Sequence, residues 1–401
     1  MLDLLIRNVV TPYHDGPVDV GISGETIQQV APRIEAPADR TVDGEGRLLT
    51  PPFVDSHFHL DSVLTRVPNS SGTLREGIDN WGRYKQEKLT EEDVYERAKR
   101  YCEHAFSMGI QAIRSHVDVC DPQLRGARAL TRLKADLKGL MDIQLVAFPQ
   151  DGYYSAPAVK KQLLAALDLG VDVVGGIPHN EPMYAQGTES LRELMQIAKE
   201  RDLMVDIHCD ESDDPNSRHV ETLTALTAQM GMAGRVTASH ITATAAMDAY
   251  YVSRKLIPMM VSAGIHVICN PLINIHLGGH FSHPRHRAMA PIRELLAAGI
   301  TVACAQDCNE DPWYPLGNAD MMEALKMGAH VGHMMGFEAL RTMYDTVTVN
   351  PARIMQLPGY GLEAGCRANL VLMRAPSVLE TIRVSPPRDL VIRNGVVKAE
   401  A

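Results

Sequence analysis

The sequence lacks several features that would place the protein in a common class. No run of about 18 apolar residues occurs, so we expect no membrane-spanning helix. Residues 1–16 include Asp3 and no long apolar stretch, which argues against a signal peptide. The net charge is −10 and no Lys/Arg-rich run occurs, so we expect neither a nucleic-acid polymer nor an anionic membrane as a partner.

Cysteine pairs and several well-known catalytic motifs are also missing. The seven cysteines form no CxxC pair, and we interpret them as reduced thiols of a cytoplasmic protein. There is no G-x-G-x-x-G after a strand, no P-loop, no H-E-x-x-H and no G-x-S-x-G elbow. An H-x-E string begins at His219, but no P-C-x-x-C follows it, which excludes the small zinc nucleobase deaminases.

What the sequence does contain is a globular composition and many histidines. It is 45% hydrophobic and 22% charged, which provides for a sizeable core and excludes disorder, collagen and coiled coil for the whole chain. A length of 401 residues allows one large α/β barrel or two to three smaller domains. There are 16 His against 6 Phe and 2 Trp, which raises the hypothesis of a metal site without locating it.

The two ends of the chain resemble each other. Residues 3–10 (DLLIRNVV) are echoed by residues 389–397 (DLVIRNGVV), where an Asn-Gly pair predicts a hairpin turn. Residues 17–31 and 367–374 also have strand character. These patterns predict a small β domain formed from residues 1–50 and 355–401, although two unrelated edge strands would give the same echo.

Between the ends, residues 51–354 alternate between short apolar runs and helical patterns. In residues 91–107, Thr90 is a candidate N-cap and Val94, Ala98, Cys102 and Ala105 recur at helical spacing. Eight strand–helix units favour a (β/α)8 barrel, with a doubly wound open sheet as the alternative. The eight predicted strands are residues 53–57, 111–117, 142–147, 171–176, 203–207, 235–239, 265–269 and 300–304.

Residues suited to metal binding or proton transfer follow four of these strands. His57 and His59 lie two positions apart, so a strand would direct both imidazoles to one side. His208 is followed three residues later by Glu211. Each pattern alone has an ordinary explanation, namely strand-end histidines paired with carboxylates for the first and a solvated acidic loop for the second.

His240 and Asp307 follow two further strands, and each is also uninformative by itself. The carboxyl ends of all barrel strands open on one face, where active sites of such barrels lie. We therefore expect these side chains to converge with those of His57, His59 and His208. His116 ends another strand and could support the site or be structural, whereas residues 280–286 are typical of a solvated loop.

The segments around these residues resemble the amidohydrolase superfamily and, more narrowly, the bacterial cytosine deaminases. The resemblance extends over nearly the whole chain, and the longer strings are specific whereas His-x-His alone is not. It is carried by residues 54–59 (VDSHFH), 71–77 (SGTLREG), 114–119 (RSHVDV), 146–152 (VAFPQDG), 206–211 (DIHCDE), 235–240 (RVTASH), 270–277 (NPLINIHL) and 311–317 (DPWYPLG).

The resemblance implies a (β/α)8 barrel with a β-sandwich made from both termini and one divalent metal ion, Fe(II) or Zn(II). Residues 171–176 lack the Lys or Glu that bridges two metals in some members of the superfamily, which favours a single ion. The family also suggests a homo-oligomer, such as a hexamer, that acts on a small nucleobase. Matching motifs assign His57, His59, His208 and Asp307 as the ligands.

The same resemblance implies the other site roles. Asp307 would take a proton from the attacking water, His240 would orient the hydroxide, and Glu211 would protonate the pyrimidine ring nitrogen. Gln150 would read the ring carbonyl and N–H, as an amide can. The remaining substrate-binding candidates are Leu74, Asp213, Cys308 and Trp313.

One position departs from the family pattern. Well-known cytosine deaminases have a second Asp directly after the ligating Asp, whereas this chain has Cys308. In the family this side chain lies near the 5-position of the ring, so a small thiol would make room for a methyl group. We therefore expect 5-methylcytosine to be accepted as well as, or better than, cytosine, unless Cys308 is a neutral filler.

Two other functions remain open from the sequence. One is deamination of another heterocycle, such as isoguanine, a triazine or creatinine, because pocket residues distinguish these poorly. The other is a non-catalytic barrel that acts as a scaffold. A scaffold would be expected to lose metal ligands, whereas all the matched positions are filled here.

Overall fold

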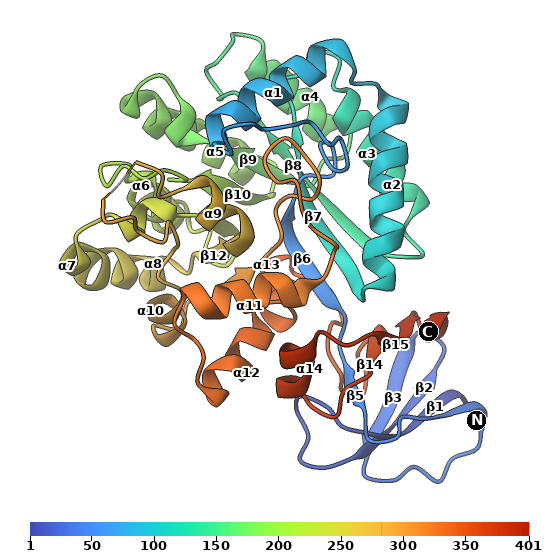
Figure 1. Cartoon of the computed structure of the whole chain (residues 1–401). Coiled ribbons are helices and arrows are strands. Elements are labelled where there is room, and N and C mark those ends of the chain that lie inside the picture. The colour runs from blue at the N-terminus through green and yellow to red at the C-terminus, as the bar shows by residue number, and fades with distance from the viewer. Residues whose placement is uncertain (282, 401) are drawn as a thin grey trace.

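Eight parallel strands form the centre of the molecule in a computed structural model that describes residues 1–281 and 283–400. Neighbouring strands in the sheet are also consecutive in the chain, which is the order of a (β/α)8 barrel (Figure 1). Each overlaps one of the eight predicted runs. The strands are β6 (Phe53–Phe58), β7 (Ile110–Asp118), β8 (Asp142–Phe148), β9 (Val173–Gly176), β10 (Met204–Cys209), β11 (Val236–His240), β12 (His266–Cys269) and β13 (Val302–Cys304).

The barrel closes where the chain after β13 meets β6. Asp307 N donates to His57 O at 2.9 Å, and His59 N donates to Asp307 O at 3.1 Å. These bonds form a parallel bridge between Phe58 and Asp307. A doubly wound sheet would reverse its strand order at a switch point and stay open. The prediction of a closed barrel is therefore confirmed, and the closing contacts involve three of the predicted metal ligands.

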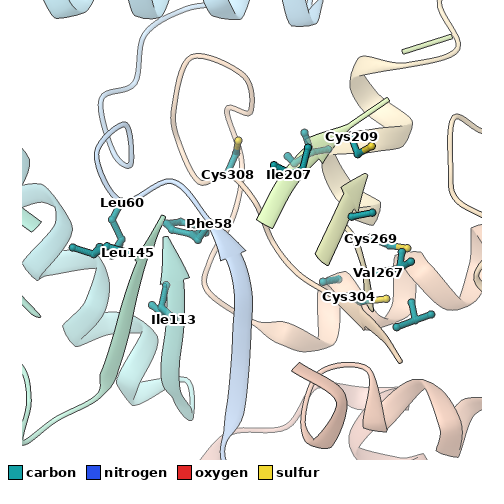
Figure 2. Close-up of a cluster of buried hydrophobic side chains, with 14 of the residues drawn as sticks. Phe58, Leu60, Ile113, Leu145, Ile207, Cys209, Val267, Cys269, Cys304 and Cys308 are labelled. Atoms are coloured by element: carbon teal, nitrogen blue, oxygen red, sulfur yellow. The ribbon is translucent and has the colours of Figure 1, made fainter. Parts of the chain in front are cut away.

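Apolar side chains from these strands build the core. β7 is buried at every position and β10 at all but Met204, because helices cover the outside of the barrel. Figure 2 shows part of this core, with Ile113, Leu145 and Ile207 pointing from three different strands. All seven cysteines are free thiols.

The helices follow the strands around the barrel. One of them, α2, runs over the predicted residues 91–107, and the Thr90 hydroxyl accepts a bond from Asp93 N at 3.1 Å as its N-cap. The α-helices are α1 (Leu74–Glu87), α2 (Glu91–Ser107), α3 (Arg125–Asp136), α4 (Val159–Asp168), α5 (Tyr184–Glu200), α6 (His219–Met230), α7 (Ala249–Tyr251), α8 (Ile257–Ala263), α9 (Pro271–Leu277), α10 (Ile292–Ala297), α11 (Met321–Val331), α12 (Phe337–Asp345), α13 (Val349–Ile354) and α14 (Val378–Val384). Shorter helical turns are η1 (Pro178–Asn180), η2 (Thr242–Ala245) and η3 (Val252–Leu256).

Both ends of the chain lie together in a smaller β structure beside the barrel (Figure 1). Its two four-stranded sheets have the orders β3-β2-β1-β4 and β16-β15-β14-β5. Apolar residues of both sheets, such as Leu4 and Ile392, share one core, as in a sandwich. The strands are β1 (Leu2–Val9), β2 (Val18–Ser23), β3 (Thr26–Ala31), β4 (Ala38–Asp43), β5 (Leu48–Thr50), β14 (Leu370–Met373), β15 (Arg388–Arg393) and β16 (Val396–Glu400).

The two similar terminal segments lie in different sheets. β1 belongs to one sheet and β15 to the other, and neither is an edge strand. The predicted turn separates β15 from β16, since Asn394 and Gly395 both have positive φ angles, 51° and 74°. A Cβ atom on Gly395 would lie 2.0 Å from the Gly24 carbonyl oxygen, so the turn also needs glycine for space. The domain limits at residues 50 and 355 remain a prediction.

Candidate metal and active site

Five polar side chains from four segments converge at one end of the barrel. His57 lies in β6 and His59 directly after it, His208 lies in β10, and His240 ends β11. Asp307 follows β13, and all five side chains are buried. The carboxyl ends of four strands therefore bring together the residues that the sequence singled out.

The donor atoms of four of these side chains have the spacing of metal ligands. His59 Nε2 lies 3.2 Å from His208 Nε2. Asp307 Oδ1 lies 3.3 Å from His59 Nε2 and 3.5 Å from His57 Nε2. Donors bound about 2.0–2.1 Å from one tetrahedral cation lie about 3.4 Å apart, so these distances fit a single ion.

The surrounding groups fit a cation as well. Donor atoms of His57, His208, His240 and Asp307 all lie within 4.8 Å of one another, as do those of His57, His59 and His116. Among residues 1–281 and 283–400, the buried His57 Nε2 has no hydrogen-bond partner. A buried imidazole nitrogen without a partner is costly unless it binds something, so this atom is a suitable ligand. The cluster could therefore hold a metal ion.

The charge states of the cluster are those of metal ligands. Burial, and then the charges of neighbouring histidines, hold the pKa of His208 well below its usual range, so this imidazole is neutral. Burial would raise the pKa of Asp307, but the nearby imidazoles of His57 and His59 hold that pKa well below its usual range. A neutral imidazole and an ionised carboxylate are the forms that bind metal ions.

A buried relay orients His57. Its Nδ1 lies 3.0 Å from the Ser239 hydroxyl, which donates its proton to Asp206 Oδ1 at 2.6 Å. Arg114 donates to the other oxygen of Asp206 at 2.9 Å. Because Ser239 uses its one proton on Asp206, it accepts from His57 Nδ1–H, and the lone pair of His57 Nε2 then faces the cluster.

Asp206 and Ser239 are not among the site residues predicted from the sequence. The signal was present, since Asp206 lies two positions before His208 on β10 and therefore shares its face. His116 is also part of the cluster, with its ring centroid 4.1 Å from that of His57. Burial, and then the charge of His57, lowers the pKa of His116 to about 3, so it is neutral.

His240 is held beside the ligands by two amides and a strained backbone. Asn274 Nδ2 lies 2.8 Å from His240 Nδ1, and Asn270 Nδ2 lies 3.3 Å from the same atom. His240 and Asp307 both have positive φ angles, 71° and 69°. Such backbone costs of order 1–3 kcal/mol per residue and is concentrated at functional sites.

A small inner cavity of about 20 Å³ opens between these residues. Most of the predicted substrate-binding and catalytic residues line it, whereas the sequence analysis missed Ile273 and Leu277. The full lining is His59, Leu74, Gln150, His208, Glu211, His240, Ile273, Leu277, Asp307, Cys308 and Trp313.

Two groups in the inner cavity hold protons. Burial, and then the charge of Asp307, raises the pKa of Glu211 well above its usual range. Glu211 Oε1 lies 3.4 Å from His240 Nδ1. Burial, and then the charge of Asp311, raises the pKa of the Cys308 thiol, so it is neutral rather than nucleophilic. Cys308 lies on the loop after β13, apart from Cys304 on the strand itself (Figure 2).

Packing fixes the other walls of the inner cavity. The loop of Gln150 is tied down by Lys85, which donates to Asp118 at 2.5 Å and to Asp151 at 3.0 Å. Trp313 packs against α1 at Gly77, where a Cβ atom would lie 2.3 Å from the indole ring. Gly77 is therefore required for Trp313 to reach the cavity.

A larger outer cavity of about 390 Å³ adjoins the inner one. Leu74, Glu211 and Leu277 line both cavities. The structure places Asp213 in the outer cavity, where its two oxygens accept from Gly279 N at 2.8 and 2.9 Å. Asp213 is thus tied to the loop after α9 and is absent from the lining of the inner cavity.

The fold and this site together define a (β/α)8-barrel enzyme with a His/Asp cluster that could hold a metal ion. The chain belongs to the amidohydrolase family, whose profile matches residues 40–399. It is a hydrolase of the kind that acts on C–N bonds. The resemblance found in the sequence is therefore confirmed.

Solved structures give a close match. A 5-methylcytosine deaminase from Klebsiella pneumoniae, solved with 5-fluorocytosine, is 38% identical with a TM-score of 0.96, and the match covers 99% of this chain and 97% of that one. The same deaminase has been solved with phosphonocytosine at the same identity and TM-score.

Curated relatives are more distant. An N-isopropylammelide isopropyl amidohydrolase from Pseudomonas sp. (strain ADP) is 30% identical, with 99% of this chain and 98% of that protein covered. A pterin deaminase from Rhizobium rhizogenes is 28% identical, with 94% and 87% covered. Among the residues that the structure describes, no helix is both long and apolar enough to cross a membrane.

Proposed function

We propose that the protein is a metal-dependent deaminase of a free pyrimidine base, converting 5-methylcytosine or cytosine and water into thymine or uracil and ammonia. The observation that carries this proposal is the inner cavity, where a protonated Glu211 and an ionised Asp307 stand beside a cluster of histidines. The 38% identical deaminase of Klebsiella pneumoniae supports the substrate class.

We assign one Fe(II) or Zn(II) ion to His57, His59, His208 and Asp307, whose donor distances support a single ion. When bound, a divalent cation lowers the pKa of a water and makes hydroxide available near neutral pH. Iron and zinc are both compatible with three imidazoles and a carboxylate. A cytoplasmic location and a homo-oligomer such as a hexamer stay predictions.

The two carboxyl groups would carry the protons. Asp307, ionised at the start, accepts a proton from the attacking water, and His240 orients that water. Glu211, protonated at the start, donates its proton to the ring nitrogen N3 next to the carbon under attack. The Glu211 carboxylate then takes up the proton that Asp307 had accepted and passes it to the leaving amine. The hydroxyl proton of the adduct finally reprotonates Glu211 as the ring carbonyl forms, so both carboxyl groups return to their starting states. Two carboxyls whose pKa values are pushed apart are suited to these opposite roles.

Three further side chains would hold the ring. Gln150 offers one acceptor and one donor, which matches the adjacent carbonyl and N–H of a pyrimidine. Trp313 and Leu74 supply apolar surface against which a flat ring packs. Leu74 and Leu277 also line the outer cavity, so they lie between the ring and that larger space.

Cys308 would set the preference at the 5-position of the ring. It is buried near three carboxyl groups, those of Asp307, Asp311 and Glu211, and burial together with the charges of Asp311 and Asp307 keeps its thiol protonated. A fourth carboxyl there would add charge to a buried site that already holds three carboxyl groups. A neutral thiol leaves a small apolar space that suits a methyl group.

We expect Cys308→Asp to lower the ratio of kcat/KM for 5-methylcytosine to that for cytosine by about tenfold or more, which is the usual range for one misplaced methyl group. Cys308→Ser, which is neutral and of similar size, serves as the control and should change the ratio much less. Steady-state assays of both bases provide the measurement. An unchanged ratio in Cys308→Asp would show that Cys308 is only a filler.

We expect the hydrogen-bonded chain from His57 through Ser239 to Asp206 to increase the metal affinity of the site. Ser239→Ala removes the acceptor of His57 Nδ1–H, so the metal-free protein should bind Zn(II) about 10–100-fold more weakly. Competition with a chromogenic chelator measures this without any assay of activity. Ser190→Ala, at another buried serine that donates to Gly187 O, is the matched control. Equal Zn(II) affinity in both variants would show that the bond between Ser239 and His57 does not contribute to metal binding.

The substrate assignment is tested by ammonia release from cytosine, 5-methylcytosine, isoguanine and creatinine. The proposal predicts release from the first two bases, with 5-methylcytosine at least equal to cytosine. Release from isoguanine or creatinine alone would favour the deaminase of another heterocycle. If none of the four compounds released ammonia, the proposed substrate class would be wrong, and only membership of the amidohydrolase family would stand.

A further inference from the structure

His240 lies close enough to the proposed ligands to bind a metal ion itself. Its Nδ1 lies 3.9 Å from Asp307 Oδ2 and 3.4 Å from Glu211 Oε1. The other oxygen of Asp307, Oδ1, is the one that lies near His57 and His59, at 3.5 and 3.3 Å. Asp307 could therefore bind one ion through Oδ1 and share a second with His240 and Glu211. A further contact must decide whether His240 acts as a ligand.

The side-chain amide of Asn274, on α9, makes that contact in an orientation that its partners fix. Its Oδ1 accepts from the backbone N–H of Asn270 at 3.1 Å, and a backbone N–H can only donate. The amide nitrogen of Asn274 is therefore the atom that faces His240, with Nδ2 2.8 Å from the ring Nδ1. Asn274 is buried, so the orientation is set by these two bonds.

This bond fixes the hydrogen of the His240 ring. An amide NH2 group can only donate, so His240 Nδ1 is the acceptor and carries no hydrogen. A hydrogen on Nδ1 would face the Asn274 N–H, donor against donor, at 2.8 Å. The single hydrogen of the neutral ring is then on Nε2. The lone pair on the ring nitrogen nearest Asp307 is thus used by Asn274 and is not available to a metal ion.

The second amide beside His240 is compatible with this arrangement. Asn270 Nδ2 lies farther away, 3.3 Å from both ring nitrogens. Within residues 1–281 and 283–400, Asn270 Oδ1 has no hydrogen-bond partner. Since rotation exchanges the oxygen and nitrogen of such an amide, Asn270 can also turn its oxygen toward Nε2–H. Asn274 is therefore the amide that fixes the state of His240.

We propose that Asn274 is a positioning residue that holds the cluster to one metal ion by occupying the Nδ1 lone pair of His240. This inference rests on the proposed function, which assigns a single ion to the other donor atoms of the cluster. Without the Asn274 donor, Nδ1 is free to bind a second cation together with Asp307 Oδ2 and Glu211 Oε1. Such an ion would occupy both carboxyl groups that the proposed function uses to move protons. Asn274 keeps these two groups available.

The test counts metal ions in the wild-type protein and in two variants. Each protein is freed of metal, equilibrated with excess Zn(II), desalted and analysed for zinc per chain. We expect about one ion in the wild type and about two in Asn274→Ala, because the variant frees His240 Nδ1. A merely structural defect would lower the zinc count rather than raise it. Asn270→Ala, which removes the neighbouring buried amide, is the matched control and should keep about one ion.

A second measurement on the wild-type protein does not depend on whether Asn274→Ala folds. Nitrogen NMR of the zinc-loaded protein, isotope-labelled at histidine, distinguishes a bare ring nitrogen from one that carries hydrogen. The signals of His240 are identified by their loss in His240→Gln. We expect a bare Nδ1 and a hydrogen on Nε2, as the bond from Asn274 requires.

The outcomes separate this inference from the proposed function. Equal zinc counts in the wild type and Asn274→Ala would overturn the inference and leave the deaminase. A hydrogen on His240 Nδ1 in the wild type would also overturn it, as would a second ion in Asn270→Ala. A wild type that binds no zinc would overturn the proposed metal site and the inference together. The expected zinc counts without turnover of any base would overturn the proposed function alone.

Discussion

Glu211→Gln should lower kcat for 5-methylcytosine by about 10²–10⁴-fold, the usual contribution of a general acid–base group. Gln has the shape of Glu but cannot deliver a proton to N3 or to the leaving amine. Glu211 is not a metal ligand in this account, so the variant should keep its metal and its fold. Steady-state kinetics and metal analysis of the same preparation measure both effects.

A second carboxyl provides the control for this loss. Glu221 lies on α6 outside both cavities and accepts from the Tyr251 hydroxyl at 2.5 Å. Glu221→Gln removes one negative charge from the same region of sequence and should leave kcat within about twofold, as for surface changes away from a site. If Glu211→Gln kept kcat within about fivefold, the proton would have to travel by another group.

Arg114→Met should lower the free energy of unfolding by about 3–5 kcal/mol, which is typical when one partner of a buried ion pair is removed. Arg114 and Asp206 are both fully buried, with a 2.9 Å contact between them. Burial would raise the pKa of Asp206, but the neighbouring His116 and Arg114 side chains hold that pKa well below its usual range. The variant leaves this carboxylate buried without its arginine partner.

The control for Arg114→Met is an exposed pair. Arg383 and Glu380 form an i, i+3 pair on α14 with 70% and 34% of their side chains exposed. Arg383→Met should change the free energy of unfolding by at most about 1 kcal/mol, because water screens such pairs. Urea denaturation of both variants gives the comparison. Similar losses in the two variants would show that the buried pair has no special role.

The fold could be predicted largely from the sequence because its elements have strong local signals. The barrel strands are apolar and short, and they alternate with helices such as α2, whose cap at Thr90 is visible in the sequence. The Asn394-Gly395 turn likewise has the residue types that its backbone angles require. Closure of the barrel requires Asp307 to pair with β6. This contact joins two segments that lie far apart in the sequence, so no local pattern specifies it.

The candidate site could be predicted only in part. His57 and His208 lie near the carboxyl ends of strands and Asp307 follows one, and barrel geometry predicts that such residues converge. Ser239 supports His57 and Asn274 supports His240 through bonds between distant segments, so their residue types alone do not reveal them. The outer cavity likewise depends on the approach of α1 to the end of α9, which follows from tertiary packing.

Removal and return of the metal ion shows whether the deaminase activity depends on it. The protein would be freed of metal with a chelator, dialysed, and assayed for ammonia release from 5-methylcytosine before and after addition of Zn(II) or Fe(II). We expect activity to fall to background and to be restored by about one equivalent of metal ion per chain, as for one cluster of His57, His59, His208 and Asp307. Full activity in the verified metal-free protein would contradict this expectation.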